Sequence, residues 1–193
     1  MTKTQVTPVL IALGANLPSA AGGPERTIPL ALQEISKAGL EVVACSRFYD
    51  TPAFPDPSDP AYLNAVAAIA TDLEPGDVLA RLHRVEALFG RERIQRWGVR
   101  TLDLDLVAYG ERVLPDLAGF TRWQRLPPEE RVRRAPEELI LPHPRLAERA
   151  FVLVPMAEIA PDWRHPVLGL TTAEMLARLP QEDRDAVRPR ADG

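Results

Sequence analysis

Leucine and aspartate alternate without interruption from Leu102 to Leu106, in the order Leu-Asp-Leu-Asp-Leu. This period of two predicts a β-strand, because successive side chains of a strand point to opposite faces of its sheet. Asp103 and Asp105 would share one face, about 7 Å apart along the strand, while the leucines take the other. Two such carboxylates suit hard divalent cations, such as the magnesium ions that accompany a nucleoside triphosphate. An edge strand with an acidic solvent face would produce the same pattern.

Arginine is concentrated just before this strand. The cluster comprises Arg81, Arg84, Arg91, Arg93, Arg96 and Arg100, whereas Lys3 and Lys37 are the only lysines of the chain. The guanidinium group is a planar, permanently charged fork that matches phosphate oxygens. The formal net charge of −4 opposes a general nucleic-acid binder. The local pattern therefore favours a phosphate-handling site, although a compositional preference for arginine would explain part of the cluster.

Other classes of site lack their sequence cues. Neither lysine follows a glycine-rich loop, so a Walker-type phosphate loop is excluded. The three histidines are far apart and Cys45 is the only cysteine, which argues against a zinc site. No Gly-x-Ser-x-Gly sequence marks a serine hydrolase. What remains is arginine with magnesium-type chemistry, in which positioning and electrostatics supply most of the rate.

Length and composition set the wider expectations. With 193 residues and no Gly/Ser linker, the chain is expected to form a single domain over residues 1–193. The first residues lack the pattern of a signal peptide, and no segment approaches the roughly 20 apolar residues that a membrane span requires. A lone cysteine fits a reducing compartment. We therefore expect a cytoplasmic protein.

Apolar periodicity and turn residues predict six elements before residue 110. They are strands at 9–13, 40–49, 62–71 and 102–109, and helices through 28–35 and 75–89. The order strand, helix, strand, strand, helix, strand predicts an α+β fold with a ferredoxin-like βαββαβ core, an antiparallel sheet with both helices on one face. The leucines of 102–109 would pack beneath the helices. The other face would stay open for a site that gathers Tyr62, Asn64 and the two aspartates.

The rest of the chain forms a C-terminal extension of this core. Residues 110–138 are charged and look like a long excursion, of a kind that is more often functional or disordered than structural. Residues 139–144 resume an extended path, and residues 145–159 are apolar enough to return to the core. The tail from about Gln181 is polar and is expected to be flexible and frayed.

Three motifs, met in order along the chain, carry a family resemblance. They are Tyr-Leu-Asn from Tyr62, Arg-Trp-Gly-Val-Arg-Thr-Leu-Asp-Leu-Asp-Leu from Arg96, and Leu-Pro-His-Pro followed by Glu-Arg-Ala-Phe at 148–151. Together they resemble the 6-hydroxymethyl-7,8-dihydropterin pyrophosphokinases of folate synthesis, over residues 9–161 with two insertions. The resemblance implies a ferredoxin-like core and transfer of the β,γ-pyrophosphoryl group of ATP to the hydroxymethyl oxygen of the pterin, releasing AMP.

The resemblance also implies the residues of the nucleotide side. Asp103 and Asp105 match two magnesium-binding aspartates, one ion bridging the α- and β-phosphates and the other the β- and γ-phosphates. Arg91 and Arg100 are implied as catalytic arginines. Further nucleotide contacts are implied for Glu86, Arg93, Trp97, Leu106, His143 and Arg149. Plainer roles remain open, such as solvated loop charges for Arg91 and Arg93, an exposed helix position for Glu86 and a turn for His143. Asp105, a metal-bound group and water remain open as the general base.

On the pterin side, Tyr62 and Phe151 match an aromatic pair that sandwiches the ring, and Asn64 matches an amide that reads the ring's edge. Thr51 and Pro52 match a loop whose backbone completes the pocket. A flat heterocycle suits such stacking surfaces and in-plane hydrogen-bonding groups. Without the resemblance, Tyr62 and Phe151 would be interpreted as core aromatics.

The sequence also departs from the family pattern. Val99 replaces a usual proline, and Glu138 and Ile140 stand where some members place an arginine and a threonine against ATP. An insertion at about 118–135, which contains Trp123, is predicted to flank the nucleotide site or to form a partner surface. A second insertion at 18–26 is expected to be a surface loop.

Two other functions stay open on sequence grounds. A ferredoxin-like sensor would bind a small molecule without turning it over, and an RNA-binding sheet would use the arginines, although the acidic face opposes it. The favoured interpretation is a monomeric, magnesium-dependent pyrophosphokinase that binds ATP and the pterin, with no nucleic acid or membrane as a partner.

Overall fold

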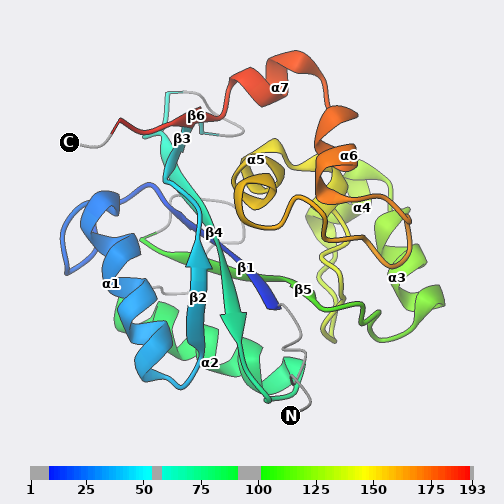
Figure 1. Ribbon diagram of the computed structural model, residues 1–193, viewed down its shortest axis with the longest axis horizontal. Helices are drawn as coiled ribbons and strands as arrows, with labels where there is room; N and C mark the ends of the chain where they lie inside the picture. Colours follow the sequence, from blue (N-terminus) through cyan, green and yellow to red (C-terminus); the bar gives the residue numbers. More distant parts are fainter. Residues whose placement is uncertain (1–8, 54–57, 91–100, 192–193) are drawn as a thin grey trace, which may run out of the picture.

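The computed structural model describes residues 9–53, 58–90 and 101–191, and within them one antiparallel sheet of six strands. The strands run in the order β5-β1-β4-β3-β6, with β2 also paired to β4 (Figure 1). Their bounds are β1 Val9–Ala15, β2 Glu41–Cys45, β3 Tyr49–Thr51, β4 Tyr62–Ala70, β5 Asp103–Tyr109 and β6 Arg188–Pro189. The strand order and antiparallel pairing confirm the predicted α+β, ferredoxin-like class.

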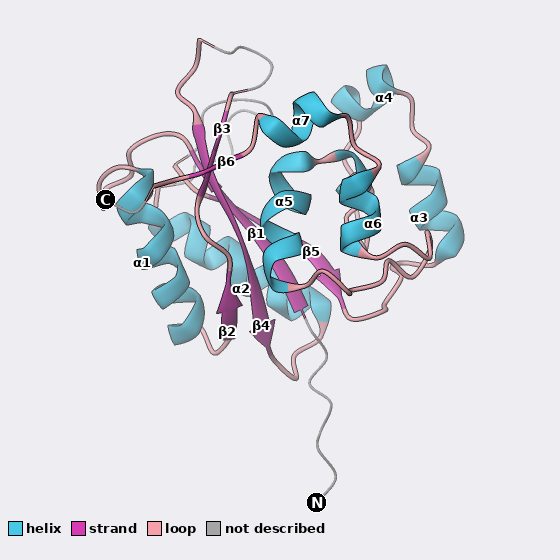
Figure 2. Cartoon of the chain, turned by 45° about the horizontal axis from the view of Figure 1, so that its top comes forward, coloured by secondary structure: helices cyan, strands magenta, loops and turns pink. Residues whose placement is uncertain are grey.

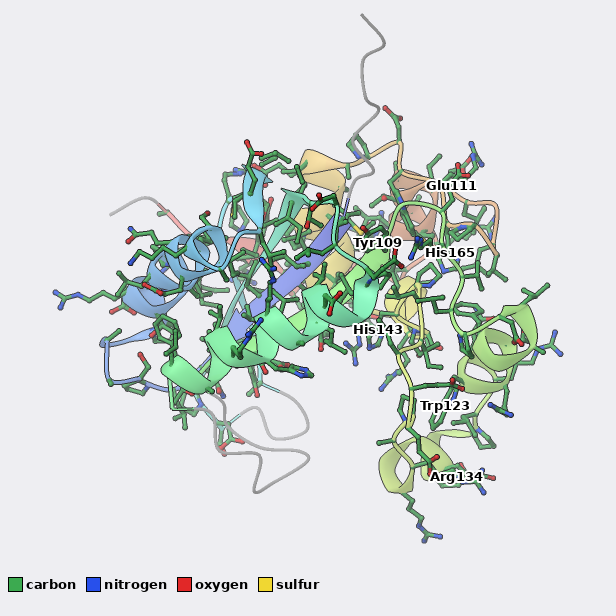
Figure 3. The ribbon with its side chains drawn as sticks, turned by 90° about the horizontal axis from the view of Figure 1, so that it is seen from below. Tyr109, Glu111, Trp123, Arg134, His143 and His165 are labelled. Atoms are coloured by element: carbon green, nitrogen blue, oxygen red, sulfur yellow. The ribbon has the colours of Figure 1, made fainter. Side chains whose placement is uncertain are left out.

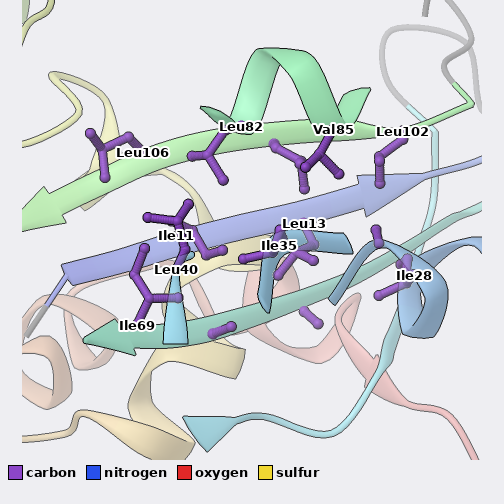
Figure 4. Close-up of a cluster of buried hydrophobic side chains, with 14 of the residues drawn as sticks. Ile11, Leu13, Ile28, Ile35, Leu40, Ile69, Leu82, Val85, Leu102 and Leu106 are labelled. Atoms are coloured by element: carbon purple, nitrogen blue, oxygen red, sulfur yellow. The ribbon is translucent and has the colours of Figure 1, made fainter. Parts of the chain in front are cut away.

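Two helices cover one face of the sheet, as predicted. Helices α1 (Pro24–Lys37) and α2 (Pro75–Leu88) each begin at a proline, which suits a first helical turn, and each is followed within two residues by a glycine with positive φ. Alternate residues of β1, β4 and β5 enter the core between sheet and helices (Figure 4). Leu102, Leu104 and Leu106 are all among them, at 4% exposure or less.

The C-terminal extension covers part of the second face. Helix α5 (Ala150–Ile159) is apolar over nearly its whole circumference, and its Val152, Leu153 and Met156 pack against Leu10 and Val66 of the sheet. The 3-10 turn Leu146–Glu148 and helix α6 (Thr172–Ala177) complete this second core. Figure 2 shows α5 and α6 on the side of the sheet opposite α1 and α2. Among the described residues, this second core does not extend to the end of the sheet that carries Asn64 and Asp103.

The predicted strand at 40–49 is interrupted. β2 ends at Cys45 and β3 begins at Tyr49. Between them, the backbone N–H of Ser46 still donates to the carbonyl of Val66 at 2.9 Å, and the Ser46 side chain makes further hydrogen bonds. Its hydroxyl accepts from the N–H of Val66 at 3.1 Å and donates to the carbonyl of Arg47 at 2.8 Å. Side-chain bonds of this kind compete with strand hydrogen bonds. Both β2 and β3 still pair with β4, so the predicted strand order is unchanged.

The excursion at 110–138 contains two short helices, α3 (Leu117–Gln124) and α4 (Pro128–Arg133). It leaves and rejoins the core where Leu114 and Leu141 form a β-bridge. Phe120 of α3 is fully buried, and its ring lies edge-on to His165 with 5.5 Å between the centroids. The insertion is therefore anchored to the C-terminal extension by a packed aromatic contact.

The expectation of a frayed tail is wrong for residues 181–191. Helix α7 (Gln181–Asp185) is followed by β6, which pairs with β3, and Val187 between them is only 7% exposed. A polar sequence can still be ordered when its backbone completes a sheet edge. Among the residues described, no helix is both long and apolar enough to cross a membrane.

Candidate active site

At the end of the second face that the core around α5 does not reach, three neighbouring strands each contribute one residue to a row. Gly14 of β1 lies opposite Asn64 of β4 on one side and opposite Asp103 of β5 on the other. Two residues further along β5, on the same face, Asp105 lies opposite Ala12. Because Gly14 and Ala12 are small, no large side chain of β1 separates the polar side chains of β4 from those of β5. The predicted gathering of Asn64, Asp103 and Asp105 on one face is therefore observed, and Tyr62 shares that face by its place on β4.

Arg149 links the aspartates to the aromatic side of the site. Its Nη1 lies 3.5 Å from Oδ2 of Asp105, and the guanidinium side chain is 19% exposed. The guanidinium carbon of Arg149 lies 5.5 Å from the ring centroid of Phe151. A half-buried arginine in this place gives a fixed positive charge beside one carboxylate.

His143 belongs to the segment after the insertion and is labelled in Figure 3. It lines a small pocket together with Asp105, Val107, Leu146, Arg149 and Val152. Its backbone N–H donates to the carbonyl of Val107 at 2.8 Å, and its Nδ1 accepts from the N–H of Arg145 at 3.1 Å. Burial, and then the charges of Arg149 and Arg145, hold the pKa of His143 well below its usual range. The ring is therefore neutral, and with Nδ1 accepting, its proton resides on Nε2.

Glu86 is not an exposed helix residue. It lies on α2 at 1% exposure, and its Oε1 accepts from the backbone N–H of Leu104 at 2.7 Å. This bond occupies the outer edge of β5, the end strand of the sheet. Leu106 lies two residues further along β5, where the pairing with β1 shifts register between Leu10 and Ile11. The Leu106 side chain is buried among the helices, so any contact with a ligand would use its backbone.

The pterin-side residues lie along β3, β4 and the start of α5. Asn64 donates through Nδ2 to Oγ1 of Thr51 at 2.6 Å, and both side chains are buried. Phe151 is 39% exposed and Tyr62 is half-buried, so neither is a core aromatic. Pro52 is exposed beside Thr51.

Four expected site residues lie outside the described residues: Arg91, Arg93, Trp97 and Arg100. One residue of the site was missed by the sequence analysis. Gly14 follows the predicted strand at 9–13 and was not considered there, although a glycine inside a strand indicates a close approach of another group. A Cβ at this position would meet Oδ1 of Asn64 at 3.0 Å.

Comparison with known proteins identifies the family. Residues 10–161 match the model of the 7,8-dihydro-6-hydroxymethylpterin-pyrophosphokinase (HPPK) family. The chain belongs to this family. It is accordingly a pyrophosphokinase of folate biosynthesis, a transferase acting on hydroxymethyldihydropterin with ATP as co-substrate.

Individual relatives agree. The chain is 41% identical over 156 residues to a 2-amino-4-hydroxy-6-hydroxymethyldihydropteridine pyrophosphokinase of Synechocystis sp., covering 81% of this chain and 68% of the relative. It is 37% identical to the protein of that name from Pseudomonas aeruginosa, over 90% of this chain and 93% of the relative. It also spans 21% of a folic acid synthesis protein of Pneumocystis carinii, at 33% identity over 94% of its own length.

The fold agrees with a solved structure. The wild-type HPPK-DHPS of Plasmodium falciparum superposes with a TM-score of 0.61 at 13% identity. The match covers 92% of this chain but only 45% of the Plasmodium chain, so this chain spans less than half of that protein.

Proposed function

We propose that the row Asn64, Gly14 and Asp103 is the place where the two substrates of this HPPK meet. The observation that carries the proposal is the strand register, which sets a residue suited to the pterin edge two strands away from a residue suited to the metal-bound phosphates. Two strand spacings are about 10 Å, a span that a pterin hydroxymethyl group and a β-phosphate fill together. In the transfer, the hydroxymethyl oxygen gives up its proton to the solvent and forms a bond to the β-phosphorus, while the bond from that phosphorus to the α–β bridging oxygen breaks and AMP leaves.

The donor set of β5 fits Mg²⁺. Magnesium in nucleotide enzymes takes one or two carboxylates and fills its other positions with phosphate oxygens and water. Asp103 and Asp105 supply two carboxylates, and the described residues contain no cluster of three or more His, Cys, Asp or Glu that would form a complete protein cage. We therefore assign both aspartates to two Mg²⁺ ions delivered with ATP. When bound, the ions would offset the charge of the polyphosphate and stabilise the attack on it.

Two other residues suit the phosphate chain. Arg149 holds a fixed positive charge 3.5 Å from Asp105. The neutral ring of His143 leaves an N–H at Nε2 that can donate to a phosphate oxygen without adding charge. Arg91, Arg93, Trp97 and Arg100 belong to this side by the family resemblance.

The edge of β5 suits the adenine ring. The carboxylate of Glu86 accepts from the N–H of Leu104, and the N–H of His143 donates to the carbonyl of Val107. The backbone of Leu106 lies between these two hydrogen bonds, and an adenine edge requires a donor and an acceptor of this backbone kind. We assign Leu106 to adenine and Glu86 to the support of this edge.

The pterin is assigned to Tyr62, Asn64, Thr51, Pro52 and Phe151. Tyr62 and Phe151 offer exposed ring surface for stacking. Asn64 is held in one orientation by Thr51, so its amide is preorganised to read the ring edge.

The test is the identity of the nucleotide product. With ATP, Mg²⁺ and hydroxymethyldihydropterin supplied together, chromatography should show AMP and a pyrophosphorylated pterin in equal amounts. Formation of ADP, or tight binding of the pterin with no product, would overturn the assignment and would favour an ordinary kinase or a sensor.

The insertion at 118–135 is assigned to the border of the nucleotide side. Its base, the Leu114–Leu141 bridge, lies two residues from His143. Deleting 118–135 should raise the KM for ATP or change the assembly state seen by light scattering, and no change in either would contradict this. A monomer in the cytoplasm, without nucleic acid or membrane partners, is proposed for the intact chain.

A further inference from the structure

The C-terminal segment returns to the sheet next to the pterin side. β6 pairs with β3, with Pro189 opposite Tyr49 and Arg188 opposite Asp50. The N–H of Arg190 extends this pairing by donating to the carbonyl of Phe48 at 2.8 Å. Figure 2 shows β6 along β3, at the end of the sheet reached from α7. The segment lies beyond the residues 10–161 that match the family model.

Val187, just before β6, is the apolar centre of this attachment. It is 7% exposed and packs in one cluster with Tyr49 and Ala150. Tyr49 begins β3, which ends at Thr51, whereas Ala150 begins α5 and precedes Phe151. Val187 therefore fills the space between the strand that supplies one wall of the pterin pocket and the helix that supplies the other.

A second link between β3 and α5 lies at the opposite end of the helix. The hydroxyl of Tyr49 donates to Oε2 of Glu158 at 2.7 Å, and Nε of Arg47 donates to Oε1 of the same carboxylate at 3.1 Å. With the far end of α5 fixed there, the position of its first turn depends on what fills the gap beneath Ala150. Val187 is the buried side chain of the C-terminal segment in that gap, and the partly buried Val154 and Leu179 pack against the same cluster.

We propose that Val187, held in place by β6, is a positioning residue that sets the separation of Thr51 and Phe151, and thus the width of the pterin pocket. The inference rests on the proposed roles of those two residues. Val187 lies behind the pocket and does not contact the substrate. Its effect is expected on pterin binding and not on ATP binding.

The first test compares two Val→Ala substitutions by AMP formation. V187A should raise the KM for hydroxymethyldihydropterin about fivefold or more, since small misplacements of binding groups are costly, and leave the KM for ATP within about twofold. V78A removes the same methyl groups from the fully buried core beneath α2, far from the pocket. It should lower thermal stability at least as much without changing the KM for the pterin. Equal effects of both substitutions on that KM, or no effect of V187A, would overturn the proposal.

The second test weakens β6 without touching the cluster. R190P removes the N–H that bonds to Phe48, whereas R190A keeps it. The position is exposed, so both variants should fold. R190P should raise the KM for the pterin, and R190A should not. At position 187 of the otherwise unmodified chain, V187I refills the space that V187A empties and should give a near-normal KM for the pterin. A KM for the pterin that is equal in R190P and R190A would contradict the role of β6. AMP formation by the unmodified chain tests the pyrophosphokinase assignment separately from these comparisons.

Discussion

The two faces of β5 differ in how they are completed. The leucine face is closed by α2, and its leucines are buried among apolar partners. The aspartate face packs against α5 as far as Val107, and beyond that point it carries the half-buried Asp103 and Asp105, with Gly14 beside them on β1. The leucines of β5 therefore contribute to the stability of the fold, whereas its aspartates are assigned to catalysis. Substitutions on one face should change unfolding and leave catalysis intact, and those on the other should do the reverse.

The largest effect is expected on the aspartate face. D103N and D105N remove the charge that would hold Mg²⁺ and keep the shape of the side chain, so turnover should fall about a thousandfold. The thermal unfolding midpoint should stay close to that of the unmodified chain. D72N, at an exposed position outside the site, is the control and should retain full activity. Near-normal turnover in both D103N and D105N would show that the metal lies elsewhere.

On the leucine face, L104A should lower the free energy of unfolding by about 3 kcal/mol, the usual cost of a large-to-small change in a packed core. Leu104 is 2% exposed, but its backbone N–H, which bonds to Glu86, is retained in the variant. Urea unfolding measures the loss, and kcat at a temperature where the variant is folded should change by less than about threefold. A large fall in kcat would mean that the two faces are not independent.

The extension that completes the second face introduces a dependence on pH. Burial lowers the pKa of His165 to about 4, and its Nδ1 accepts from the N–H groups of Val167 and Leu168. Between that value and the ordinary pKa, the unfolded chain binds a proton that the folded chain does not, so stability falls as pH decreases. The loss from pH 7 to pH 5 should be on the order of 2 kcal/mol.

H165N tests this assignment because an Asn Oδ1 can keep an acceptor for the two N–H groups while removing the titration. The difference in unfolding free energy between pH 7 and pH 5 should be smaller in H165N than in the unmodified chain. His143 also has a lowered pKa, but it is present in both proteins and its contribution cancels. An unchanged pH dependence in H165N would assign the effect to other groups.

Sequence patterns predicted the parts of this molecule that depend on local periodicity. The faces of β4 and β5, the two helices and the gathering of Asn64 with the aspartates follow from the spacing of apolar residues. The break at Ser46, the strand β6 and the burial of Phe120 could not be predicted, because each depends on a partner far away in the chain. The same holds for Glu86, whose burial depends on Leu104 and not on its neighbours in α2.

The smallest effect on activity is expected at Gly14, which lies between Asn64 and Asp103. In G14A the added Cβ would lie 3.0 Å from Oδ1 of Asn64, so the amide must move by a few tenths of an ångström. Because Thr51 holds the other end of that amide, the movement should misalign the group that reads the pterin. The KM for the pterin should rise about tenfold, equivalent to about 1.4 kcal/mol, with the KM for ATP unchanged. G76A is the matched control, since a Cβ there meets nothing within 4 Å, and it should leave both constants unchanged. If G14A raised the KM for ATP and not that for the pterin, the space beside Gly14 would belong to the nucleotide, and the assignment of Asn64 to the pterin would be wrong.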